Sequence, residues 1–188
     1  MGYTRSEETV LVRIARRSIE AILKGRSLED LDMDPCRFSA ALREKKAVFV
    51  SLILNSELRG SAGYLMPLVP LWQATMENAR NAAFRDPRFT PLWRDELPEV
   101  EIVVHVVSRV MHISAEDKFN PREEGFLLRK GSRMALFLPM PWRTPLTPRD
   151  EVLSRLCREV AHDSGGSTAA EERERLILEG IIREQDTA

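Results

Sequence analysis

The sequence predicts an α+β protein with a mixed, largely antiparallel sheet and flanking helices. Strand-like segments occur in pairs around turn residues, as in hairpins; the clearest pair is the apolar run Ala47–Leu54 and the return segment Leu58–Leu65. Segments with apolar residues at helical spacing separate such runs, at Ser6–Lys24 and Leu71–Phe84. Helices and strands therefore interleave irregularly, which disfavours a doubly wound parallel sheet.

The N-terminal region predicts two helices before the first strand. The first is expected from about Ser6 to Lys24, since Thr4 and Glu7 have capping-box spacing and Gly25 suits a helix end. The second is a short helix after Asp34, with Pro35 in its first turn.

A hairpin and a helix are expected next. Ala47–Leu54 is short and rich in β-branched residues, so it predicts a buried strand. Asn55–Glu57 is predicted as a three-residue turn into the antiparallel return strand Leu58–Leu65. The helix Leu71–Phe84 follows, and Pro87 prevents its continuation.

The C-terminal half predicts further strands and one helix. Val100–Ile113 is the longest strand candidate, and a helix is expected to end near His162. Leu176–Arg183 fits a final strand better than a short helix. Two shorter strands are expected at Phe126–Arg129 and Met134–Leu138.

The composition excludes several classes of protein. Of 188 residues, 43% are hydrophobic, and the net charge is −1, so no global attraction to nucleic acid or to an anionic membrane is expected. Cys36 and Cys157 stand alone, which favours a reducing cytoplasm and no disulfide. The N-terminus lacks the pattern of a signal peptide, and no run reaches membrane-spanning length. A cytoplasmic location is expected.

Several motifs resemble one known family. Phe49–Leu52 with Leu58–Gly63 resembles the "VFVTL…LRGCIG" core of the AMMECR domain family, which in bacteria and archaea is called AmmeMemoRadiSam system protein A. Asn78–Phe89 resembles the family's helix with its "A…DPRF" exit. Gly125–Gly131 with Phe137–Pro139 resembles "GLIL.KG…FLP". The resemblance is collinear over roughly Leu11 to Val160.

The resemblance implies a fold, a domain organisation and partners, but no reaction. It implies two unequal, closely packed subdomains within residues 1–165, followed by a C-terminal segment, 166–188, that holds the last strand and a tail. It also implies Memo-like and radical-SAM partner proteins. The sequence departs from the family pattern where Ser61 replaces a cysteine, Ala62 an isoleucine, and Met140-Pro141-Trp142 a Gln-Val-Trp triplet.

The candidate binding residues lie on the signature hairpin and on the turn after the next helix: Arg59, Gly60, Ser61, Gly63, Arg85, Asp86 and Arg88. In the functional interpretation, the arginines and backbone amides face an anion or a partner carboxylate. In the structural interpretation, the glycines allow close packing and Arg59 pairs with an acid of the chain. Strand alternation predicts Arg59 and Ser61 on one face, beside a concave surface that the Arg85–Phe89 turn also lines.

A catalytic set is harder to find. Ser61 would need a nearby base to act as a nucleophile, and no Ser-His-Asp order is present. His105, His112 and His162 are scattered without metal-ligand spacing, so neither a metal nor a cofactor is expected. The sequence favours an accessory or binding component. The alternative is an enzyme acting on a small polar substrate in a cleft near Arg59 and Ser61.

Overall fold

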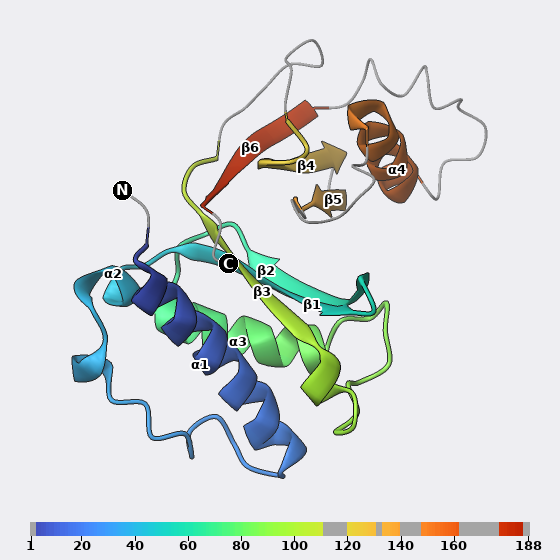
Figure 1. The fold of residues 1–188 in the computed structure, drawn as a ribbon. Coiled ribbons are helices and arrows are strands. Elements are labelled where there is room, and N and C mark those ends of the chain that lie inside the picture. Colours follow the sequence, from blue (N-terminus) through green and yellow to red (C-terminus); the bar gives the residue numbers. More distant parts are fainter. Residues whose placement is uncertain (1–2, 111–119, 131–132, 140–147, 162–176, 186–188) are drawn as a thin grey trace. The chain divides into compact units, whose positions relative to one another are not determined.

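The computed structural model describes residues 3–110, 120–130, 133–139, 148–161 and 177–185. The chain divides into two compact units, one of Met1–Val107 with Gln185–Ala188 and one of Ser108–Glu184. Both contain helices and antiparallel strand pairs, so the predicted α+β class is confirmed (Figure 1). The predicted domain boundary between residues 165 and 166 lies outside the described residues.

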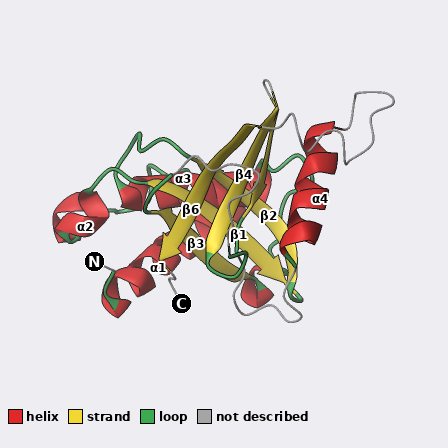
Figure 2. Ribbon diagram, turned by 90° about the horizontal axis from the view of Figure 1, so that it is seen from above, coloured by secondary structure: helices red, strands yellow, loops and turns green. Residues whose placement is uncertain are grey.

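The first unit is a three-stranded antiparallel sheet with helices on one face. Its strands β1 (Ala47–Leu54), β2 (Glu57–Tyr64) and β3 (Glu101–Val107) are arranged in the order β2-β1-β3. The helix α3 (Leu71–Phe84) packs on β1 and β2, and α1 (Arg5–Leu23) packs on α3 and β3 (Figure 2). The predicted helix Leu71–Phe84 is therefore confirmed residue for residue.

The predicted hairpin is confirmed, but its turn is shorter than expected. Leu54 pairs directly with Glu57, which leaves only Asn55 and Ser56 in the loop. Their φ angles, 53° and 64°, both lie in the left-handed region that a type I′ turn requires. The prediction of a three-residue loop was wrong, because Glu57 already belongs to the return strand.

The ends of α1 follow the local sequence signals. Thr4 and Glu7 form the predicted capping box. At the other end, Gly25 (φ 71°) follows the cap, and the Arg26 amide donates to the Ala21 carbonyl oxygen at 2.8 Å, as in a Schellman motif. The predicted short helix is divided into a 3₁₀ turn, η1 (Pro35–Arg37), and a single α-helical turn, α2 (Ala40–Arg43).

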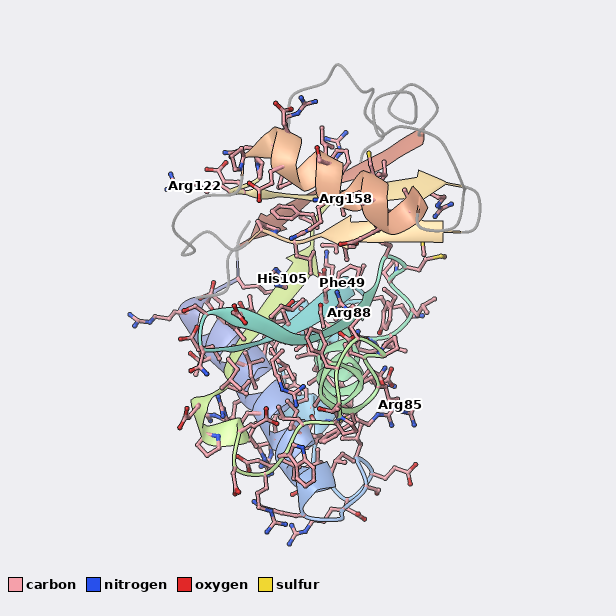
Figure 3. The ribbon with its side chains drawn as sticks, turned by 90° about the vertical axis from the view of Figure 1, so that its right-hand side faces the viewer. Phe49, Arg85, Arg88, His105, Arg122 and Arg158 are labelled. Atoms are coloured by element: carbon pink, nitrogen blue, oxygen red, sulfur yellow. The ribbon has the colours of Figure 1, made fainter. Side chains whose placement is uncertain are left out.

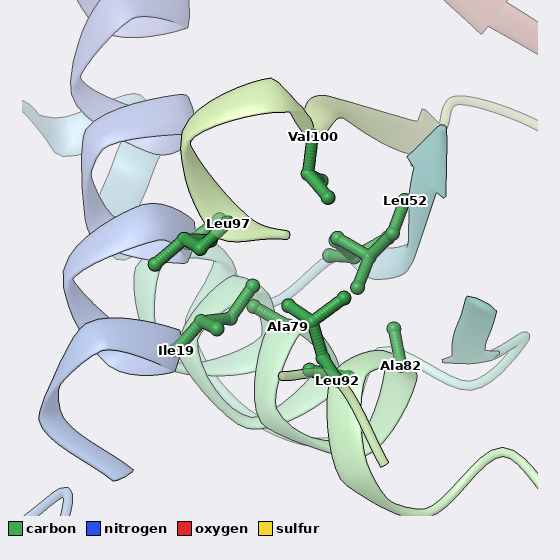
Figure 4. Packing of buried hydrophobic residues seen from close by; sticks show 10 residues of the cluster. Ile19, Leu52, Ala79, Ala82, Leu92, Leu97 and Val100 are labelled. Carbon is green, nitrogen blue, oxygen red and sulfur yellow. The ribbon is translucent and has the colours of Figure 1, made fainter. Parts of the chain in front are cut away.

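The core of the first unit lies between the sheet and its helices. Ile19 of α1 and Ala79 and Ala82 of α3 meet Leu52 of β1 (Figure 4). Leu92, and Leu97 at the start of the 3₁₀ turn η2 (Leu97–Glu99), fill the same cluster from the connection after α3. This connection is therefore part of the core, and it fixes the backbone around the candidate site.

The second unit pairs β4 (Glu124–Lys130) with β5 (Arg133–Phe137) and with β6 (Ile177–Gln185), all antiparallel. The favoured C-terminal strand is thus present as β6. The helix α4 (Arg149–Ala161) covers β4 and β5 through a core that includes Phe126, Leu156 and Cys157. The long strand predicted to Ile113 ends at Val107, and residues 111–113 lie outside the described chain.

Candidate functional site

The glycines of the signature hairpin allow close packing. Gly60 pairs with Leu52 on the face that packs against α3, and a Cβ on Gly60 would collide with the Ala82 carbonyl oxygen. Gly63 pairs with Phe49, and a Cβ there would lie 2.6 Å from the Cα of Phe49. Any side chain at either position would displace backbone or a core ring.

A β-bulge lies beside Arg59. The register moves from Leu52↔Gly60 to Ile53↔Leu58, so Arg59 is the extra residue on β2. This interrupts the regular alternation used to place Arg59 and Ser61 on one face. The two side chains have different partners, because Arg59 is held by the connection after α3 and Ser61 by the sheet.

Arg59 makes several bonds within the chain. Its Nε and Nη2 donate to the two carboxylate oxygens of Glu96 at 2.8 and 2.9 Å, in a bidentate pair. Its Nη1 donates to the Thr90 carbonyl oxygen at 2.9 Å. Only 15% of the Arg59 side chain and 24% of the Glu96 side chain are exposed. Arg59 therefore fastens the connection Thr90–Glu96 to the bulge of β2.

Glu96 also orders the backbone of this connection. One of its carboxylate oxygens accepts the Trp93 amide at 2.7 Å. Hydrogen bonding from Arg59 lowers the pKa of Glu96, although partial burial opposes the shift. Glu96 is therefore ionised at neutral pH and holds Arg59 and Trp93 together.

Asp86 joins the turn after α3 to the edge of the sheet. Its carboxylate accepts the Ser61 amide at 2.8 Å and the Arg88 Nη2 at 2.7 Å. It also accepts the Arg88 amide at 3.1 Å, which closes the turn. Burial raises the pKa of Asp86, but hydrogen bonds from Arg88 and Ser61 outweigh it and lower the pKa. Asp86 is a buried, ionised anchor.

The two arginines of this turn differ in their surroundings. Arg88 pairs with Asp86, its guanidinium lies 5.5 Å from the centre of the Phe89 ring, and 56% of its side chain is exposed. Arg85 caps the end of α3 and is exposed to solvent. The two side chains point in different directions from the turn (Figure 3). Phe89 is only half-buried.

Ser61 and Ser51 form a polar cross-strand pair on one face of the sheet. The Ser61 hydroxyl is 3.2 Å from the hydroxyl of Ser51, which is buried. Phe49 and its partner His105 are on the same face (Figure 3). Complete burial lowers the pKa of His105 to about 3, so the imidazole is neutral at physiological pH. No base is hydrogen-bonded to the Ser61 hydroxyl within the described structure.

The described residues offer no preformed metal centre. Within the described ranges, no three His, Cys, Asp or Glu side chains gather as metal ligands. Among the helices that the structure describes, none has the length and apolar character needed to cross a membrane.

The fold and motifs agree with comparisons to known proteins. A family model described as AMMECR1 matches residues 12–174. The chain belongs to the AMMECR1 family. This AMMECR1 chain is similar to the crystal structure of an uncharacterised protein from Pyrococcus horikoshii, with a TM-score of 0.73 and 28% identity. The match covers 92% of this chain and 86% of that one.

Archaeal relatives support the assignment to the AMMECR1 family. A protein of Thermofilum pendens is 34% identical over 174 residues, which is 84% of this chain and 80% of its own length. A protein of Thermococcus onnurineus is 36% identical over 140 residues, 69% of this chain and 66% of its own. A Methanopyrus kandleri protein is 36% identical over 150 residues, which is 72% of this chain and 68% of its own length. None of these names states an activity.

The sequence does not single out three residues in the hydrogen-bond network of the candidate site: Glu96, Trp93 and Ser51. Glu96 lies 37 residues from Arg59, so no local spacing predicted their pairing. The turn alone could not have placed Ser51 opposite Ser61, because a two-residue turn without a bulge pairs Ser51 with Gly60, and the bulge at Arg59 moves its partner to Ser61.

Proposed function

We propose that this AMMECR1-family chain is a non-catalytic accessory component that binds Memo-like and radical-SAM proteins. These partners are the ones that the sequence resemblance implied. The exposed Arg85 and Arg88 would form the contact surface, and the other candidate residues would hold the hairpin and the turn in shape: Arg59, Gly60, Ser61, Gly63 and Asp86.

One observation carries this proposal. The polar groups of the candidate site bond to other groups of the chain: Arg59 to Glu96, Asp86 to Arg88 and Ser61, and the Ser61 hydroxyl to Ser51. A nucleophile requires an adjacent base, but the Ser61 hydroxyl bonds only to another hydroxyl in the described structure. Such an arrangement supports a preorganised surface better than an acid–base set.

The exposed cations supply the proposed contact. Arg85 and the half-exposed Arg88 project from a turn whose backbone Asp86 fixes. A partner carboxylate that meets such a held guanidinium forms a charge-assisted hydrogen bond at a low cost in conformational entropy. Acidic residues are therefore expected on the partner.

The test measures the affinity of the purified chain for Memo-like and radical-SAM proteins from the same organism by isothermal titration calorimetry. Arg59→Glu is expected to weaken binding, because it reverses a charge and releases the Thr90–Glu96 connection. Arg85→Glu should weaken binding without disturbing the fold. Losing a buried charge contact costs about 2–5 kcal/mol, whereas losing the Ser61 hydroxyl in Ser61→Ala should cost about 1 kcal/mol.

The alternative function is an enzyme that acts on a small polar substrate near Arg59 and Ser61. The Ser51–Ser61 pair, with neutral His105 on the same sheet face, is the observation that favours it. A turnover that Ser61→Ala abolishes, together with partner affinities that Arg59→Glu and Arg85→Glu leave unchanged, would establish the enzyme and refute the accessory role.

A further inference from the structure

A cleft with a volume of about 160 Å³ lies at the C-terminal end of α1. It shares no lining residue with the candidate site on the hairpin. Three cations, one acid and two apolar residues line it: Arg17, Lys24, Arg26, Glu20, Ala21 and Leu31.

The helix supplies one wall of the cleft. Arg17, Ala21 and Lys24 are spaced by four and three residues, so they share one face of α1. The Schellman motif then reverses the direction of the chain. Its hydrogen bond, from the Arg26 amide to the Ala21 carbonyl oxygen, brings Arg26 close to Ala21. The same motif uses the Ala21 and Ile22 carbonyl oxygens, so these acceptors are already paired.

A tight turn supplies the opposite wall. The Ser27 amide donates to the Asp30 carboxylate at 2.7 Å, and the Asp30 amide donates to the Ser27 hydroxyl at 3.3 Å. These reciprocal bonds hold the turn that brings Leu31 to the cleft. Leu31 and Ala21 give the cleft an apolar part, and the cations surround it.

The charges of the cleft do not balance. Lys24 lies 3.5 Å from Glu20 and compensates its charge. Arg17 and Arg26 have no carboxylate within ion-pair distance among the described residues, so the three cations and one acid leave a charge of +2. Asp30 does not line the cleft, but its ionised carboxylate, which accepts the Ser27 amide, also interacts with Arg26 and reduces the positive charge there.

We propose that this cleft binds a small dianion, either a phosphate group or a pair of carboxylates on a short carbon skeleton. Arg17 and Arg26 would donate to the anion's oxygens, because a guanidinium presents two parallel N–H donors. Ala21 and Leu31 would contact the carbon skeleton. The volume is below the ~300 Å³ of typical ligand pockets, so the cleft fits only a small molecule or a single anionic group.

The test follows backbone amide signals of the ¹⁵N-labelled full chain by NMR during titration. Inorganic phosphate and succinate are added separately, each against sodium chloride at equal ionic strength. Saturable shifts confined to the amides of Ala21, Lys24, Arg26 and Leu31 are expected. The anion with the lower half-saturation concentration, phosphate or succinate, shows whether the cleft prefers a phosphate group or a dicarboxylate.

Substitutions at the cleft test both the direction and the magnitude of the change in anion affinity. Arg17→Gln and Arg26→Gln should each weaken binding about fivefold. This is the largest effect expected from the loss of one solvent-exposed ion pair. Glu20→Gln should strengthen binding, because it removes the acid that repels the anion. Arg43→Gln makes the same change in net charge at an exposed residue of α2, outside the cleft, and should leave affinity unchanged.

The proposal is overturned if the shifts grow linearly with concentration for both anions. It is also overturned if Arg43→Gln weakens binding as much as Arg26→Gln, since only net charge would then matter. Weaker binding by Glu20→Gln would contradict the proposed charge balance, even where an arginine variant failed to fold.

Discussion

Arg59 and Glu96 show how a single pair of side chains can organise a connection. The pair is bidentate and mostly shielded from solvent, and both partners also bond to the backbone between Thr90 and Glu96. Removing one partner would leave the other charge without its hydrogen bonds, which costs more than losing an exposed ion pair. The contrast is Lys24–Glu20, where both side chains are exposed.

Glu96→Gln tests this role through its dependence on pH. The lowered pKa of Glu96 means that its contribution is present above the ordinary value of 4.5 and is lost as pH falls through the lowered value. At pH 7 the variant should lose about 1–2 kcal/mol in free energy of unfolding, measured with urea. The loss should shrink as pH falls below 4.5. A loss that is independent of pH would contradict an ionic role for Glu96.

Gly60→Ala tests the close approach of β2 to α3. A methyl group would collide with the Ala82 carbonyl oxygen, which belongs to helix backbone and cannot rotate away. Overpacking of this kind should cost about 3 kcal/mol or prevent folding. Gly25→Ala is the control, because it has open space and strains only its own φ of 71°, at about 1 kcal/mol. Equal urea midpoints for the two variants would refute the steric argument.

At the scale of elements, β2 is an edge strand of the first unit's sheet. Edge strands present free amides that can pair with another chain. Here the Asp86 carboxylate covers the Ser61 amide, and the bulge at Arg59 interrupts the ladder. The turn after α3 therefore protects the edge and also positions the candidate residues.

Ser56→Gly tests the tight turn of the hairpin. Ser56 has a φ of 64°, which costs little for glycine and more for serine, and Asn-Gly is the preferred pair for a type I′ turn. The variant should gain about 0.5 kcal/mol in free energy of unfolding. Ser56→Val, which is β-branched, should destabilise the protein. A stabilising valine would show that the turn is not of this type in solution.

At the scale of the whole molecule, each unit has its own hydrophobic core and one cysteine. Cys36 is exposed in the first unit, whereas Cys157 is 3% exposed in the core of the second. Cys157 therefore packs as a small core hydrophobe. The two thiols can therefore report on the two units separately.

The thiols should react in two steps with Ellman's reagent. One equivalent, from Cys36, should react at once in native protein, and the second, from Cys157, only as the second unit opens in urea. Cys36→Ser should remove the fast step alone. Both thiols reacting at once, or a Cys36–Cys157 linked peptide in non-reducing mass spectrometry, would contradict the prediction.

The sequence by itself determined the features that depend on neighbouring residues. The capping box at Thr4, the helix Leu71–Phe84, the hairpin strands and the α+β class followed from spacing and turn chemistry within a few residues. The signature around Arg59 also identified the family. These signals depend only on neighbouring residues, so they can be recognised without the tertiary structure.

Only the tertiary structure decided what the candidate residues contact. It paired Arg59 with Glu96, placed Asp86 under the Ser61 amide, and set Gly60 against the Ala82 carbonyl oxygen. The bulge that breaks the alternation around Arg59 was equally hidden, since it is defined by the pairing of β2 with β1 and not by the residues of β2 alone. These contacts join segments more than twenty residues apart, and only the packing of the helices on the sheet brings their side chains together.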